Sequence, residues 1–319
     1  MNISVVGYGY WGKNLVRNFD DLGMLYAVCD WDHSRREIAA QKYPDARFYS
    51  EYDEVLADAA VDAVVLATPA VSHFEMARQA FQAGKDLYVE KPLAMNVQEG
   101  RELQEMAEEN DCILMVGHIL RYHPAVMKLE ELVRQGALGQ VRYLYSNRLN
   151  MGKIRTEENI LWSFAPHDIS VMLAISGEEP SRVSCGGGSY VSEDVADVTV
   201  SQFVFPGGLR AHIYVSWLHP FKEQRLVVIG SEKMAVFDDT AEQKLVLYPH
   251  KVEWKDHLPS AVKAEGEVVA IDDGEPLRRE CQHFIDCVEN HTTPRTDATE
   301  SIRVLKVLDA CQRSLKLLS

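Results

Sequence analysis

Hydrophobic residues in the first third of the chain gather in short, nearly continuous runs that alternate with amphipathic stretches. Because parallel strands are buried on both faces, such runs are typical of a parallel sheet, and the stretches between them predict helices. The predicted strands lie at 3–6, 25–29, 47–49, 61–67, 86–89 and 113–116. Strands alternating with helices in this way predict an α/β Rossmann domain, a doubly wound parallel sheet, over residues 1–120.

Beyond residue 120 the hydrophobic pattern changes from continuous runs to alternation. Strands are predicted at 141–149, 182–191, 197–205, 209–217, 224–230, 233–237 and 244–248. Helices are predicted at 124–135, 165–176, 276–290 and 298–317, and a loop without regular structure at 252–267. The pattern therefore predicts, over residues 121–319, an α+β domain with a large open, mainly antiparallel sheet.

The composition excludes several classes of partner. A formal net charge of −15 argues against nucleic acid or an anionic membrane as the main partner, since both need a basic surface. The six cysteines are scattered, with no Cys-x-x-Cys pair, as in reduced cytoplasmic proteins. We expect neither a signal peptide nor a membrane-spanning segment, because no apolar run has the required length and flanks. The expected location is the cytoplasm.

Three glycines follow the first predicted strand with the spacing Gly-x-Gly-x-x-Gly, in Gly7-Tyr8-Gly9-Tyr10-Trp11-Gly12. They allow a tight turn, a close approach of the backbone to a pyrophosphate, and close packing of the next helix. Asp30 follows about 20 residues later, where a carboxylate can bind both ribose hydroxyls of an adenosine. A carboxylate there would repel a 2′-phosphate, which favours NAD over NADP, although Arg35 and Arg36 lie nearby. The alternative role for Asp30 is a helix cap or a turn.

Lys91 follows the fifth predicted strand, at the carboxyl edge where open α/β sheets bind ligands. A lysine there can donate a hydrogen bond to a reacting alcohol oxygen, and Pro92 makes the preceding peptide a candidate cis bond. His167, at the expected start of a helix, can accept a hydroxyl proton as a general base, and Asp168 could cap the helix or orient the imidazole. The alternatives are a surface lysine–glutamate pair and an ordinary helix-start histidine. No metal site is expected from the spacing of the other candidate histidines, His73, His118 and His123.

Several of these residues together resemble one known family. The glycine loop, Ala67-Thr68-Pro69 with His73, Glu90-Lys91-Pro92-Leu93-Ala94 and the later His167 resemble the Gfo/Idh/MocA oxidoreductases over essentially the whole chain. The resemblance implies NAD as the cofactor of the first domain, and substrate binding and oligomerisation by the second. It also implies that Lys91 and His167 are catalytic. Four positions before the histidine the family usually has an acidic residue, whereas this chain has Ser163, which argues against a plain inositol dehydrogenase.

The resemblance also implies which residues contact the ligands. Cofactor contacts are expected at Gly7, Tyr8, Gly9, Tyr10, Trp11, Gly12, Asp30, Thr68, Pro69, His73, Glu90, Lys91 and Arg121. Substrate contacts are expected at Lys91, Tyr122, Arg148, Arg155, Asn159, Trp162, Ser163 and His167. Arg148, Lys153 and Arg155 form a small basic cluster in an acidic chain, which suits a diphosphate; the alternative is solvated surface charge.

Within the family, the segments 117–125 and 155–168 resemble the branch that acts on nucleotide-linked sugars. This implies oxidation of the 3-hydroxyl of a UDP-linked amino sugar, of the UDP-N-acetylglucosamine type, to a 3-oxo sugar. An aminotransferase, as in lipopolysaccharide pathways, would then use the product. Two alternatives stay open: dehydrogenation of a free polyol or sugar, of the inositol or glucose type, and a non-catalytic NAD(H)-binding sensor. Because the family usually associates through its open sheet, a homodimer or homotetramer is expected.

Overall fold

The computed structural model describes residues 1–152, 154–156 and 158–317. The chain divides into two compact units. The first contains Met1–Tyr122 and Gly274–Leu305, and the second contains His123–Asp273 and the chain from Lys306 onward. Within the described ranges, no helix is long and apolar enough to cross a membrane.

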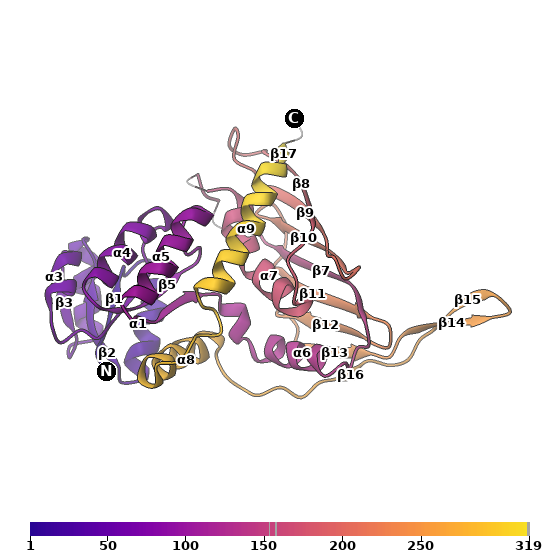
Figure 1. The fold of residues 1–319 in the computed structure, drawn as a ribbon, viewed down its shortest axis with the longest axis horizontal. Helices are drawn as coiled ribbons and strands as arrows, with labels where there is room; N and C mark the ends of the chain where they lie inside the picture. The colour runs from indigo at the N-terminus through magenta and orange to yellow at the C-terminus, as the bar shows by residue number, and fades with distance from the viewer. Residues whose placement is uncertain (153, 157, 318–319) are drawn as a thin grey trace. The chain divides into compact units, whose positions relative to one another are not determined.

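The first unit is built on a six-stranded, all-parallel sheet in the order β3-β2-β1-β4-β5-β6 (Figure 1). Its strands are β1 (Ile3–Val6), β2 (Leu25–Cys29), β3 (Arg47–Tyr49), β4 (Ala63–Leu66), β5 (Asp86–Glu90) and β6 (Leu114–Gly117). The helices between them are α1 (Gly12–Asp21), α2 (His33–Lys42), α3 (Tyr52–Ala57), η1 (Ala70–Ser72), α4 (His73–Gln82) and α5 (Val97–Glu109), and η2 (Ile119–Tyr122) follows β6. The strand order reverses between β1 and β4, which is where such sheets bind ligands at their carboxyl edge. The predicted doubly wound sheet is confirmed.

Helix α8 (Pro276–Asn290) belongs to this first unit, whereas the change of hydrophobic pattern predicts residues 274–305 in the second domain. The physical reason is its apolar face, because Leu277, Cys281 and Phe284 join the core of the first unit. The ring of Phe284 packs edge-on against that of Tyr88 on β5, with centroids 5.8 Å apart. A helix distant in sequence therefore closes the core beneath the end of β5.

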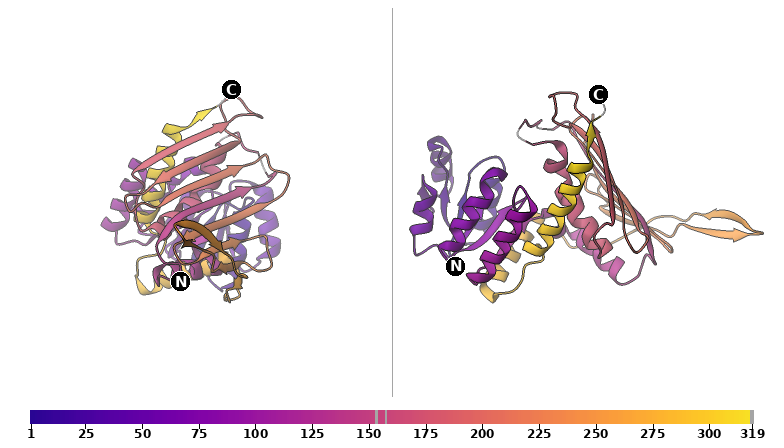
Figure 2. Two further views of the ribbon diagram at one scale, coloured as in Figure 1. Left: turned by 90° about the vertical axis from the view of Figure 1, so that its right-hand side faces the viewer. Right: turned by 45° about the horizontal axis from the view of Figure 1, so that its top comes forward.

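The second unit contains a nine-stranded sheet in the order β16-β13-β12-β11-β7-β10-β9-β8-β17. Its strands are β7 (Val141–Leu149), β8 (Arg182–Gly188), β9 (Val198–Val204), β10 (Arg210–Ser216), β11 (Glu223–Gly230), β12 (Met234–Asp238), β13 (Leu245–Tyr248), β16 (Glu267–Val268) and β17 (Lys316–Leu317). Most pairs are antiparallel, but β7 with β10 and β8 with β17 are parallel. Helices α6 (Pro124–Arg134) and α7 (Ile160–Ser176) lie on one face, and the strands of the other face are open to view (Figure 2). Helix α9 (Ala298–Ser314) contributes to both units. The predicted mainly antiparallel sheet is confirmed.

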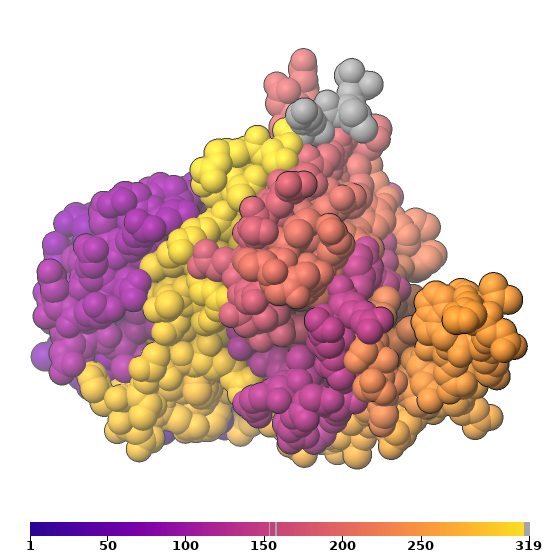
Figure 3. All heavy atoms as spheres, turned by 45° about the vertical axis from the view of Figure 1, so that its right-hand side comes forward, coloured from indigo at the N-terminus to yellow at the C-terminus, as the bar shows by residue number. Residues whose placement is uncertain are grey.

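The prediction of an irregular loop at 252–267 is wrong. A hairpin of β14 (Lys251–Lys255) and β15 (Leu258–Val262) occupies most of it and projects from the nine-stranded sheet (Figures 1 and 2). In the space-filling view it forms a separate orange lobe (Figure 3). Its turn uses Asp256 and His257 at φ of 50° and 65°. Asn-Gly or Asp-Gly usually provides such a turn, so Asp-His gives only a weak hairpin signal.

Candidate active site

The glycine loop has the close contacts that make glycine necessary. Gly7 has a φ of 98°, and a Cβ there would lie 2.8 Å from the carbonyl oxygen of Ala67. A Cβ on Gly12 would lie 1.8 Å from the carbonyl oxygen of Gly7, so α1 begins directly against the turn. At Gly9 the nearest atom to such a Cβ is 3.9 Å away, on Arg35, which leaves room for a ligand. The loop can therefore cradle a pyrophosphate at the N-terminus of α1.

Asp30, at the end of β2, is only 4% exposed and its carboxylate holds two backbone segments. One oxygen accepts a hydrogen bond from the Tyr8 amide at 2.7 Å, and the other accepts one from the Asp32 amide at 2.9 Å. The guanidinium of Arg35 lies 3.6 Å from the same carboxylate. The residue is thus attached to the glycine loop, as expected for a carboxylate beside the adenosine ribose. The helix cap of α2 is Asp32, not Asp30.

His73 connects the segments that follow β4 and β5. Its ring is 1% exposed, with Nδ1 2.7 Å from the carbonyl oxygen of Pro92 and Nε2 3.0 Å from that of Thr68. The Lys91–Pro92 peptide, a candidate cis bond from the sequence, is cis. His73 therefore holds the backbone that carries Lys91, and its side chain is directed into the protein.

Glu90 is a buried carboxyl group next to Lys91. It accepts hydrogen bonds from Trp11 Nε1 at 2.5 Å, from the Tyr88 hydroxyl at 3.2 Å and from the Lys91 amide at 3.3 Å. Burial raises the pKa of Glu90 to about 7, although these donors and the charge of Lys91 favour its ionised form. Within the first unit, Glu90 joins the glycine loop to the segment that carries Lys91.

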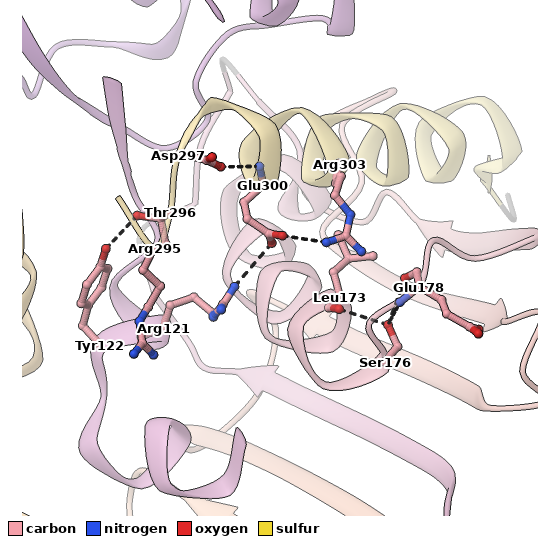
Figure 4. A network of polar contacts seen from close by, with 10 residues as sticks. All are labelled: Arg121, Tyr122, Leu173, Ser176, Glu178, Arg295, Thr296, Asp297, Glu300 and Arg303. Carbon is pink, nitrogen blue, oxygen red and sulfur yellow. Dashed lines mark hydrogen bonds and ion pairs between the residues drawn. The ribbon is translucent and has the colours of Figure 1, made fainter. Parts of the chain in front are cut away.

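Arg121 on η2 contacts the first turn of α9 and the segment before it. Its guanidinium lies 3.5 Å from one carboxylate oxygen of Glu300, and the other oxygen of Glu300 accepts a hydrogen bond from Arg303 at 2.6 Å (Figure 4). Arg295 donates to the backbone carbonyl of Arg121 at 3.3 Å. Arg121, a predicted cofactor contact, therefore has a structural ion pair in this unit.

Tyr122 and His118 are also buried in the first unit. The hydroxyl of Tyr122 lies 3.0 Å from that of Thr296 (Figure 4). Burial, followed by the charges of Arg121 and Lys91, lowers the pKa of His118 to about 3. His118 is therefore neutral at physiological pH, in the electrostatic neighbourhood of Lys91. Tyr122, predicted to contact substrate, has its hydroxyl directed toward Thr296.

In the second unit, α7 begins earlier than the sequence indicated. It starts at Ile160, because Asn159 caps it by accepting the Trp162 amide at 3.2 Å. The Asn159 amide and the indole of Trp162 both donate to the side-chain oxygen of Gln312, at 2.9 and 3.0 Å. His167 therefore lies within α7, half-buried, and Ser163 is buried one turn before it. The prediction that His167 opens a helix is wrong.

Asp168 binds a strand of the sheet. It accepts hydrogen bonds from Ser146 Oγ at 2.6 Å and from Arg148 Nε at 2.7 Å. When the Gln224 side-chain amide is oriented so that its nitrogen faces Asp239, its oxygen accepts a hydrogen bond from Arg148 Nη1 at 3.0 Å. Arg148 is only 11% exposed at its side chain, so its guanidinium is committed to protein partners. Asp168 does not cap the helix, since Asn159 does, and its bonds to Ser146 and Arg148 anchor α7 to β7 beside His167.

The remaining members of the predicted basic cluster differ from Arg148. Arg155 lies 3.0 Å from Glu158 and its side chain is 42% exposed, so it can reach a ligand. Lys153 lies outside the described residues.

Two groups near Glu90, namely Tyr88 and Glu280, were not identified from the sequence. Among the residues that the structure describes, no group of three or more His, Cys, Asp or Glu side chains could hold a metal ion.

Known proteins resemble this chain over nearly its whole length. A family model described as "Oxidoreductase family, NAD-binding Rossmann fold" matches residues 1–118, and one described as "GFO/IDH/MocA C-terminal domain" matches residues 126–236. UDP-N-acetylglucosamine 3-dehydrogenase of Acidithiobacillus ferrooxidans is 28% identical over 96% of this chain and 94% of its own. The NAD(+)-dependent scyllo-inositol 2-dehydrogenase of Bacillus subtilis is 27% identical over 95% of this chain and 90% of its own.

Solved structures agree. That of the same Acidithiobacillus ferrooxidans enzyme has a TM-score of 0.87 at 27% identity, covering 99% of this chain and 97% of that one. Levoglucosan dehydrogenase in complex with NADH and levoglucosan shares the fold, with a TM-score of 0.84 at 19% identity over 98% of this chain and 96% of that one. The chain therefore belongs to the Gfo/Idh/MocA oxidoreductases, and, as its NAD-binding Rossmann family model indicates, NAD is its cofactor.

Proposed function

We propose that this chain is an NAD-dependent dehydrogenase that oxidises the 3-hydroxyl of a UDP-linked amino sugar to a 3-oxo sugar. The observation that supports it most is the near full-length similarity to UDP-N-acetylglucosamine 3-dehydrogenase in a chain that also has Lys91 after β5 and His167 on α7. Together these supply a hydrogen-bond donor and a proton acceptor of the kinds that alcohol oxidation needs.

Bound NAD supplies the hydride acceptor. Lys91 donates a hydrogen bond to the sugar oxygen and stabilises the negative charge that grows on it as the proton leaves. His167 accepts that proton on its imidazole. The hydrogen on the carbon that bears this oxygen leaves with its electron pair, as a hydride, for NAD. The glycine loop binds the pyrophosphate of the cofactor through backbone amides. Asp30 is assigned to the adenosine ribose.

Arg155 is assigned to the diphosphate of the substrate. Arg148, the other described member of the basic cluster, has its guanidinium engaged by Asp168 and Gln224. Among the described residues Arg155 has an ion pair with Glu158, and its side chain is 42% exposed. An arginine of this kind can form bidentate hydrogen bonds to phosphate oxygens.

Substitution of His167 by Asn tests the catalytic assignment. Because a positioned general base is worth about 10²–10⁴ in rate, H167N should lower turnover by roughly that factor while the dissociation constant of NADH stays near that of wild type. The matched control is H257N, in the exposed turn of the hairpin where φ is 65° and Asn is well tolerated. Near-normal turnover in H167N would refute the role of His167.

A screen of sugars tests the substrate. NAD reduction is followed by NADH absorbance with UDP-N-acetylglucosamine, its uronate, glucose and myo-inositol, with 2-oxoglutarate and an aminotransferase present to remove a 3-oxo product. The relatives named inositol dehydrogenases support the free polyol as a second candidate. Activity on inositol or glucose, with no competition by UDP, would favour that candidate. A protein that binds NADH but reduces NAD with none of these sugars would be a sensor.

The assembly is also a proposal. A homodimer or homotetramer would cover the face of the nine-stranded sheet that α6 and α7 leave open in the second unit (Figure 2). Val200 on β9, which is 40% exposed, lies on that face between inward-facing Thr199 and Ser201. Charge introduced by V200E should therefore shift the mass measured by light scattering toward the monomer, and an unchanged mass would contradict this interface.

A further inference from the structure

Glu280 is a carboxylic acid in the hydrophobic core of the first unit. It lies on the face of α8 that also carries Leu277, Cys281 and Phe284, and its side chain is fully buried. An ionised carboxylate in such surroundings costs several kcal/mol unless donors or a counter-charge compensate it. A purely structural core would favour leucine at this position.

Among the described residues, neither carboxyl oxygen of Glu280 makes a hydrogen bond of good geometry. The Tyr88 hydroxyl is close enough to favour the ionised form, but it donates to Glu90 at 3.2 Å. Burial and the charge of Glu90 therefore raise the pKa of Glu280 well above its usual value. Glu280 retains its proton at neutral pH and has a hydroxyl group to donate.

Glu90 is the member of this pair that ionises more readily. Unlike Glu280, it accepts hydrogen bonds from Trp11, Tyr88 and the Lys91 amide, and it interacts with the charge of Lys91. Space around it is tight, because a Cβ on Gly117 would lie 2.8 Å from the Tyr88 hydroxyl and 2.9 Å from a Glu90 oxygen. Glu90 and Tyr88 thus form a compact polar group, and Phe284, one turn after Glu280 on α8, packs edge-on against Tyr88.

We propose that Glu280 is a positioning residue: from α8 its carboxyl group supports the hydroxyl of Tyr88, which donates to Glu90, and so helps to hold Glu90 against Trp11 and the Lys91 backbone. Through Glu90 it acts on both parts of the cofactor site in this unit, the glycine loop and the segment of the catalytic lysine. The inference rests on the proposed function only for the role of Lys91, since NAD binding follows from the family.

Of the ionisable groups that interact with Glu280, one changes its charge near neutral pH. Glu280 interacts with Glu90 and Tyr88 from β5, with Tyr122 from η2 and with Cys281 on its own helix. Burial raises the pKa of Tyr88, of Tyr122 and of Cys281, so these three stay neutral. Of these groups it is Glu90, whose pKa is raised to about 7, that changes charge in this range.

Two substitutions of Glu280 test the proposal. E280L fills the space but removes the donor, whereas E280Q keeps a neutral donor of nearly the same shape. We expect E280L to weaken NADH binding about 10-fold, since loss of fixed geometry by a fraction of an ångström has effects of this order, and E280Q to restore most of that affinity. E280L should melt no lower than wild type, because it removes a buried acid without partners. The matched control is E289L, an exposed position on the same helix.

The dissociation constant of NADH is measured by its fluorescence, without any sugar. The proposal is overturned if E280L binds NADH like wild type, or if E280Q is as impaired as E280L. It is also overturned if E280L loses affinity only in step with a lower melting temperature. Should E280L fail to fold, E280M serves instead, because methionine keeps the length of the side chain but removes the donor, and the same loss of affinity is expected. Turnover assays are separate, so failure of the sugar proposal leaves this result interpretable.

Discussion

If Glu280 keeps its proton in the folded protein, the free energy of unfolding must depend on pH in a predictable way. In the unfolded chain this glutamate ionises near its usual pKa of 4.5, whereas burial and Glu90 keep its proton on in the folded protein. The folded state therefore binds more protons than the unfolded state between these two pKa values, so this group lowers the stability of the wild type as pH rises. In E280Q this contribution is absent.

The magnitude follows from proton linkage. A full difference of one proton changes the free energy of unfolding by about 1.4 kcal/mol per pH unit. Between about pH 5.5 and 7 the advantage of E280Q over wild type should therefore grow by roughly 2 kcal/mol. Any constant cost of burying the glutamine amide cancels, because it is the same at both pH values. The contribution of Glu90, whose pKa is also raised, is present in both proteins.

Amide hydrogen exchange measures this difference in the correct part of the molecule. Peptides from β5 and α8 report the opening free energy of the first unit, and comparison of two proteins at one pH cancels most of the intrinsic exchange rate. E289Q, on the exposed side of the same helix, is the control and should show no slope. If the advantage of E280Q stays within about 0.5 kcal/mol over this range, Glu280 is not the proton carrier inferred from its burial and the reasoning is wrong.

Three further predictions concern other contacts. Gly117→Ala should destabilise the first unit by about 1–3 kcal/mol and weaken NADH binding, because its Cβ would meet the Tyr88 hydroxyl and Glu90; equal stability and affinity would contradict the packing. Arg148→Met should lower the unfolding free energy by about 3–5 kcal/mol, since it leaves Asp168 buried without its main partner, and a loss under 1 kcal/mol in a denaturant titration would argue against that pairing. Arg155→Met should raise the KM of a UDP-sugar about 10-fold with little change in kcat, and an unchanged KM would remove Arg155 from the diphosphate site.

The glycine loop shows what could be predicted from sequence. Local sequence determines the backbone geometry of this loop. It therefore reveals the buried strand, the three glycines at fixed spacing and the acid at the end of the next strand. The structure places all of these at one edge of one sheet. Lys91 could be located by the same reasoning, because it follows a strand whose end must lie at that edge. The connection between them, the hydrogen bond from Trp11 to Glu90, joins side chains 79 residues apart and has no local signal.

Arg148 shows why side-chain roles in the second unit were harder to predict. Its charge in an acidic chain suggested a phosphate ligand, but the structure gives it Asp168, 20 residues away on another element, as a partner. Periodicity placed Asp168 correctly on a helix and Arg148 on a strand. The pairing of the Arg148 and Asp168 charges depends on the packing of α7 on β7, which local sequence does not reveal. Arg155, in a segment without regular structure, keeps its side chain accessible and remains a prediction.

Glu280 lies between these cases, because part of its signal was present in the sequence. Helix α8 was predicted, and on it Glu280 falls three positions after Leu277 and four before Phe284, where an apolar residue is expected. An acid at such a position lowers stability at neutral pH, by the linkage argument above, and a leucine of similar volume would avoid that penalty. A group that is unfavourable for folding yet lies beside the residue that joins Trp11 to Lys91 is best explained by the geometry it maintains there. The same reasoning gives the test its direction: if Glu280 serves the cofactor site, its replacement by leucine must separate stability from NADH affinity, since a core defect would lower both together.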